Sequence, residues 1–122
     1  MTSGVLRVVG MIVGLGLVLG TGYGLSRAGR PYGALLLNAH KLVGLAMLVF
    51  IVWRSIALHR AAALASGLWI VASLAALALV VLLGTGGVLS AAASPPAVVR
   101  WLHKVVPYVA VVLSGVWIYL VR

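Results

Sequence analysis

Long apolar stretches separated by short polar breaks run along the whole chain. A helix that crosses a bilayer takes about 20 mostly apolar residues. Four stretches meet this length, at roughly residues 4–25, 34–58, 65–89 and 97–121. The three breaks between them are short, so consecutive helices should be antiparallel neighbours. The pattern predicts an all-α integral membrane protein, with residues 1–122 forming a single domain, a four-transmembrane-helix bundle.

The chain also contains an internal repeat. The matching segments, in the same order in both copies, are LGTG at 19–22 and 83–86, Pro31 and Pro95, HK at 40–41 and 103–104, and Trp53 and Trp117. We therefore predict two helix-hairpin repeats, over about residues 4–58 and 65–122. A unit with two spans returns to its starting side, so the copies have parallel topology. Because its glycine pattern recurs and it is long for a signal peptide, we interpret the first stretch as a membrane helix.

Two histidines occupy equivalent places in the repeats. His40 and His103 each lie about six residues, roughly 9 Å, inside a helix start, and the two helices run in the same direction. An ionisable residue inside a membrane segment indicates a functional site, and two at one depth indicate a shared ligand. We expect one haem b per chain, with both histidines as metal ligands. A chlorophyll on each histidine, or interfacial histidines without a cofactor, remain alternatives.

Two further groups of residues are expected to complete this cofactor site. Small residues on the helices leave space for a flat macrocycle, namely Gly20, Gly22, Gly44, Gly84 and Gly86. Cations near the histidines can pair with the haem propionates, namely Lys41, Lys104, Arg27, Arg30 and Arg100.

This arrangement resembles the small four-helix b-type membrane cytochromes, which pass electrons between quinols and membrane partners. The resemblance covers the whole chain in architecture, and its specific residues are His40, His103 and the helix glycines. It implies a bis-His haem b in a non-catalytic electron carrier, or in a subunit of a quinone-linked or photosynthetic assembly. The chain departs from the usual pattern of this family in one respect. Family members usually hold two haems, whereas this chain has one matched histidine pair, enough for one haem. The alternative is a cofactor-free accessory subunit of a larger membrane complex.

Composition narrows the choice of chemistry. The 122 residues include no Asp, Glu or Cys, only 7% are charged, and mean hydropathy is +1.29. Acid–base catalysis by an Asp or Glu side chain and thiol redox chemistry are therefore excluded. The missing membrane carboxylate also argues against a proton-coupled exporter. The net charge of +9 does not indicate nucleic acid, because the cations are scattered at helix ends. We expect lipid, membrane proteins or further copies of the chain as partners, with a quinone as a further candidate.

The cations leave the orientation nearly balanced under the positive-inside rule. The side with the termini carries Arg7, Arg54, Arg60 and Arg122, and the other side carries Arg27, Arg30, Lys41, Arg100 and Lys104. If part of the second group neutralises a bound anion, the remaining excess favours both termini in the cytoplasm. We expect the cytoplasmic (inner) membrane of a bacterium.

Other polar and aromatic residues have simpler interpretations. His59 lies about 28 Å along the helix from His40, so we expect a solvated histidine at the membrane interface. Arg54 is expected to extend its charge to the interface. Tryptophan and tyrosine fall mostly toward helix ends and predict an aromatic belt.

Overall fold

The computed structural model describes residues 2–121, which form four helices and no strand. The helices are α1 (Ser3–Ala28), α2 (Ala34–Ala61), α3 (Ser66–Ala91) and α4 (Ala97–Val121). Each is long and apolar enough to cross a membrane. The predicted all-α, four-helix membrane fold is confirmed, with helix ends within three residues of those expected.

Local sequence explains where α1 begins and ends. Val5 donates its backbone N–H to Oγ1 of Thr2 across 3.4 Å, which satisfies one of the free amides at the start of the helix. Gly29 follows the helix with a φ of 69°, a conformation that glycine adopts without strain. Because Pro31 cannot continue a helix, the chain turns here toward α2.

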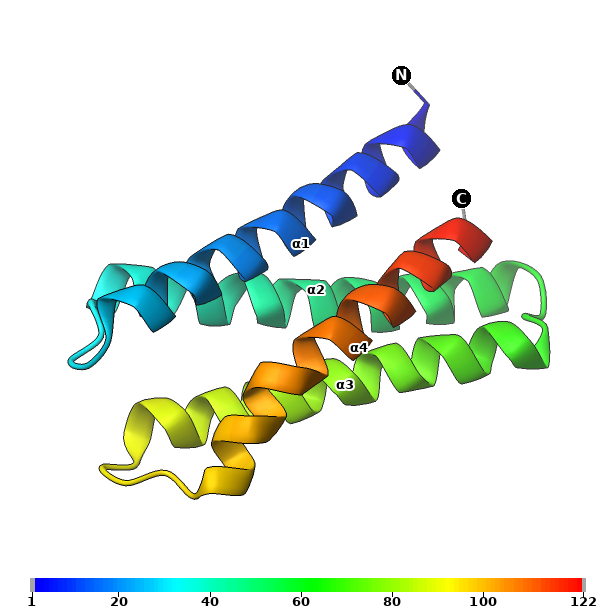
Figure 1. Cartoon of the computed structure of the whole chain (residues 1–122). Coiled ribbons are helices and arrows are strands. Elements are labelled where there is room, and N and C mark those ends of the chain that lie inside the picture. The colour runs from blue at the N-terminus through cyan, green and yellow to red at the C-terminus, as the bar shows by residue number, and fades with distance from the viewer. Residues whose placement is uncertain (1, 122) are drawn as a thin grey trace.

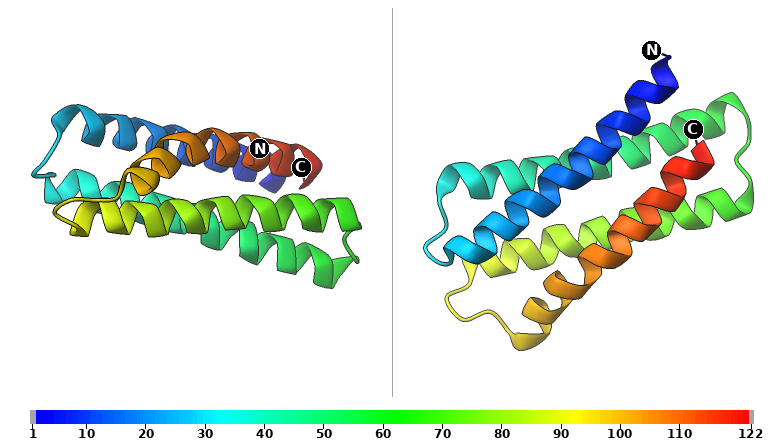
Figure 2. Two further views of the ribbon diagram at one scale, coloured as in Figure 1. Left: turned by 60° about the horizontal axis from the view of Figure 1, so that its bottom comes forward. Right: turned by 45° about the horizontal axis from the view of Figure 1, so that its top comes forward.

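The helices form two layers (Figure 2). α2 and α3 pack side by side in one layer, while α1 lies over α2 and α4 lies over α3. α1 and α4 touch each other least among the neighbouring pairs. The second helices of the two repeats, α2 and α4, therefore sit diagonally across the bundle. The loops at residues 29–33 and 92–96 lie at one end, and both chain termini lie toward the other (Figure 1).

The core is built mainly from α2, α3 and α4, and α1 contributes Met11. On α3, the small residues Ala72, Ala75 and Ala78 are buried, which lets a neighbouring helix approach closely. On α4, Trp117 is only 1% exposed and donates its indole N–H to Oγ of buried Ser55 across 3.0 Å. Trp117 is thus a core residue and does not belong to the aromatic belt expected for most of the tryptophans and tyrosines.

Candidate functional site

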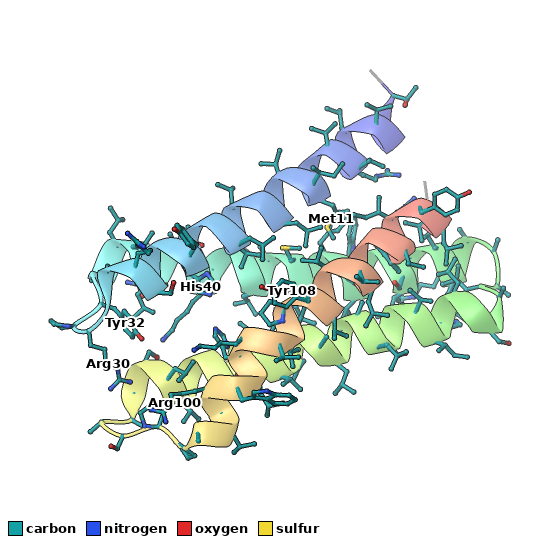
Figure 3. All side chains as sticks on the ribbon, viewed as in Figure 1. Met11, Arg30, Tyr32, His40, Arg100 and Tyr108 are labelled. Atoms are coloured by element: carbon teal, nitrogen blue, oxygen red, sulfur yellow. The ribbon has the colours of Figure 1, made fainter. Side chains whose placement is uncertain are left out.

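His40 and His103 meet between the diagonal helices α2 and α4. Their ring centroids are 6.4 Å apart and the ring planes cross at 73°. Both side chains are partly buried. They lie in the half of the bundle nearest the 29–33 and 92–96 loops, where Figure 3 labels His40. The structure therefore brings together the two histidines that the repeat singles out.

A threonine holds each ring from the other helix of the same repeat. Oγ1 of Thr21 lies 3.0 Å from Nδ1 of His40, and Oγ1 of Thr85 lies 2.8 Å from Nδ1 of His103. Each threonine belongs to the LGTG segment of its repeat. The first helix of each hairpin therefore orients the histidine on the second helix.

The threonine contacts favour one protonation pattern of both rings. The hydroxyl of Thr21 lies 2.7 Å from the carbonyl oxygen of Leu17, and that of Thr85 lies 2.8 Å from the carbonyl oxygen of Val81. A carbonyl oxygen only accepts, and a hydroxyl that donates its single proton there has only its lone pairs left for the histidine. The threonine oxygen then accepts from Nδ1–H of its histidine. This tautomer leaves Nε2 of each ring unprotonated, as a metal ligand requires.

One glycine of each LGTG segment makes room for the ring. A Cβ built on Gly22 would lie 3.0 Å from Cε1 of His40, and one on Gly86 would lie 3.1 Å from Cε1 of His103. A side chain at either position would displace the imidazole. In contrast, Gly20 and Gly84 have no such neighbour within 4 Å. A Cβ built on Gly44 would meet Leu83 and Val18 at ordinary contact distances of 3.8 and 3.9 Å.

The five predicted cations lie at the histidine end of the bundle, and two of them tie the repeats together. Lys41 donates to Oγ of Ser90 on α3 across 2.8 Å. Arg30 donates to the carbonyl oxygens of Leu89 and Ala93. The other three sit in the last turn of α1 or the first two turns of α4, namely Arg27, Arg100 and Lys104. Figure 3 shows Arg30 and Arg100 together at this end.

The histidine pair provides only two nitrogen donors for a metal ion. Within residues 2–121, no group of three or more His, Cys, Asp or Glu side chains gathers around a possible metal position. Structural metal sites made by protein alone usually need about four donors. A metal shared by His40 and His103 would therefore need further donors from a bound group.

The threonines were missing from the predicted site, although their signal is in the repeat. The glycines of LGTG predict space for a macrocycle, whereas no role was predicted for the threonine, the third residue of the segment. Thr21 and Thr85 recur with the same spacing as the glycines. A threonine in the middle of a helix commonly bonds to a carbonyl one turn back, which leaves its oxygen free to accept from a neighbouring helix.

His59 has a structural contact at the other end of the bundle. Its Nδ1 accepts from the backbone N–H of Leu64 and from the indole N–H of Trp69, both across 3.2 Å. The ring stays exposed, as expected of an interfacial histidine. It also joins the α2–α3 loop to the start of α3.

Comparison with known proteins assigns no relative. No protein-family model, curated protein or solved structure matches this chain. What the site can do therefore follows from the geometry of its own side chains.

Proposed function

We propose that this protein is a membrane b-type cytochrome that carries electrons by means of one haem b per chain. The observation that supports this most directly is the paired orientation of His40 and His103. Each ring is held at Nδ1 by a threonine, which leaves both Nε2 atoms available as ligands.

The spacing of the rings fits a single shared metal. With metal–nitrogen bonds of about 2.0–2.1 Å, two imidazole centroids on opposite sides of one ion lie roughly 6 Å apart. The observed 6.4 Å agrees with that value. Two stacked chlorophylls, one on each histidine, would need roughly a further 3.5 Å between the rings. The spacing therefore favours one macrocycle over two.

The surrounding charges suit a haem. The macrocycle supplies the four donors that the protein lacks, and its propionates supply the negative charge. Arg27, Arg100 and Lys104 lie at the histidine end in a chain that contains no acidic side chain. Carboxylates placed among these cations gain charge-assisted hydrogen bonds.

The role that follows is electron transfer without substrate chemistry at the iron. A haem b held in this way supplies a one-electron redox centre. With His40 and His103 both bound to the iron, no coordination position would remain for a substrate, and the nearby cations would raise the reduction potential. We place the protein in a quinone-linked or photosynthetic assembly of a bacterial inner membrane, with both termini in the cytoplasm.

A visible absorption spectrum of the detergent-purified protein, made with haem available, tests this proposal. We expect a sharp α-band on dithionite reduction and loss of that band in His40→Ala and in His103→Ala. His59→Ala is the matched control, because it removes a histidine from the opposite end and should retain the band. A featureless wild-type spectrum would rule out the cytochrome and favour a cofactor-free accessory subunit. A chlorophyll spectrum after expression in a photosynthetic host would likewise contradict haem.

A further inference from the structure

A second polar site lies at the opposite end of the bundle, near the chain termini. A cavity of about 370 Å³ opens there between α1, α2 and α4. Within residues 2–121, its charged lining consists of Arg7 from α1 and Arg54 from α2. The apolar lining includes Phe50, Leu58 and Trp117.

The two arginines share this cavity without a counter-charge from an acidic side chain. Because Arg7 and Arg54 line the same cavity, their positive charges repel each other. The chain has no Asp or Glu to pair with either guanidinium. A single anion between the two would remove the repulsion and could form bidentate hydrogen bonds with each.

The start of α1 adds to the positive character of the cavity. Ser3 and Gly4, the first two residues of α1, line it. Their amides lie in the first turn, where helix N–H groups have no partner within the helix and favour an anion. The cavity thus combines two guanidinium groups with a helix N-terminus.

The internal repeat shows that the fold itself does not require these charges. At the repeat offset of 64, Arg7 corresponds to Val71 and Arg54 corresponds to Ile118. Val71 packs against the core and Ile118 is buried in it. The arginines occur only in the first copy, on α1 and α2, and their cavity adjoins the sparsely packed pair α1 and α4.

The depth of Arg54 places the site at the membrane boundary. α2 is 28 residues long, so it measures about 42 Å and extends about 6 Å beyond each side of a hydrocarbon core of about 30 Å. Arg54 lies seven residues before the end of α2, or about 10 Å from it. Its backbone is therefore just inside the hydrocarbon boundary, where an uncompensated cation is costly.

We propose that this cavity binds the phosphate of an anionic phospholipid headgroup. Arg7 and Arg54 contact the phosphate, and the apolar lining accepts the first part of an acyl chain. The same phosphate chemistry could be met by a soluble anion, but a cavity at the membrane boundary with apolar walls favours the lipid. The site is independent of the histidine pair at the other end.

Lipid titration of the full chain in neutral detergent tests the proposal. We expect phosphatidylglycerol to raise the thermal unfolding midpoint of the wild type, with native mass spectrometry showing a retained lipid. Phosphatidylcholine should have little effect. Arg7→Gln and Arg54→Gln should each weaken phosphatidylglycerol binding at least tenfold. Arg60→Gln is the matched control, because Arg60 lies at the same end of α2 and does not line the cavity.

The alternative results are distinct. If Arg60→Gln weakened phosphatidylglycerol binding as much as Arg54→Gln, the lipid would be attracted by the basic surface in general. That result would overturn the proposal of a specific site in the cavity. Inorganic phosphate that stabilises the wild type as well as phosphatidylglycerol does, at equal concentration, would assign the cavity to a soluble anion instead. If Arg54→Gln alters the helical circular dichroism, Arg7→Gln decides the question, since Arg7 is exposed.

Discussion

Oγ1 of Thr85 lies 2.8 Å from Nδ1 of His103, and this hydrogen bond joins one helix of the second hairpin to the other. Thr21 and His40 repeat this contact in the first hairpin. Each hairpin therefore orients its own histidine, and the two hairpins need only come together for the rings to face each other. The repeat thus produces a paired site from two copies of one local arrangement.

Removing the threonine hydroxyl should loosen the histidine without emptying the space around it. Thr85→Val keeps the side-chain shape but removes the acceptor for Nδ1–H of His103. Loss of such a partner typically lowers metal affinity about 10- to 100-fold. We expect a similar loss of haem affinity, measured by haem titration of the apoprotein. Thr85→Ser keeps the hydroxyl and should stay close to the wild type.

If Thr85→Val bound haem as tightly as Thr85→Ser, the orienting role of the threonine would be wrong. Thr21→Val supplies an independent repetition in the first hairpin. A reduction potential that shifts in the valine variants but not in the serine variant would add support, because it reports on the ligand and not on folding.

Adding one methyl group to either close glycine should displace a histidine ring. The Cβ in Gly86→Ala meets Cε1 of His103 at 3.1 Å, and that in Gly22→Ala meets Cε1 of His40 at 3.0 Å. Overpacking of this kind typically costs about 1–3 kcal/mol. We expect a loss of stability of that size in denaturant unfolding, together with reduced haem content.

The same repeat provides the control for this steric effect. Gly84→Ala and Gly20→Ala place a methyl group where no atom lies within 4 Å. Alanine is favoured over glycine inside a helix by about 0.5–1 kcal/mol, so these variants should be as stable as the wild type or more so. Equal destabilisation at Gly84 and Gly86 would show that the cost comes from the helix and not from the ring.

The sequence predicted the helices and the histidine pair for physical reasons that hold in any membrane protein. Span length follows from bilayer thickness, so the apolar stretches located the four helices. The depth of His40 and His103 followed from the repeat, since equivalent positions in parallel copies lie at the same level. Neither inference required knowing which side of a helix faces inward.

The side that each helix turns inward was harder to predict. In a bilayer the outward residues are as apolar as the buried ones, and here Val112 is 64% exposed while Ile51 is fully buried. Hydrophobic periodicity therefore could not show that Trp117 enters the core or that Arg7 and Arg54 share a cavity. Those contacts depend on how α1 and α4 pack against α2, which the sequence pattern does not determine.

The buried pair Trp117 and Ser55 should contribute measurably to bundle stability. Their hydrogen bond joins α4 to α2 at the end opposite the histidines. Interhelical hydrogen bonds in membranes average about 0.6 kcal/mol, with a maximum near 1.7. A double-mutant cycle of Trp117→Phe and Ser55→Ala should give a coupling energy in this range. A coupling indistinguishable from zero would mean that Ser55 is simply filling space beside the indole.

Truncation of the same tryptophan tests its place in the core. Trp117 is 1% exposed, and removing a large buried aromatic side chain typically costs about 3–5 kcal/mol. Trp117→Ala should therefore be strongly destabilising. Trp101→Ala is the matched control, because Trp101 is 59% exposed on the same helix. We expect it to cost much less in the same denaturant unfolding experiment.

His59 should stabilise the α2–α3 connection without affecting the paired histidines. Its Nδ1 accepts from Leu64 and Trp69, and a typical hydrogen bond contributes about 0.5–1.5 kcal/mol. His59→Ala should therefore lower the free energy of unfolding by about 1–2 kcal/mol and speed amide hydrogen exchange at Leu64. Haem content should remain at the wild-type level. Loss of haem in this variant, with the fold intact by circular dichroism, would show that the two ends of the bundle are coupled, contrary to the independence expected from their separation along α2.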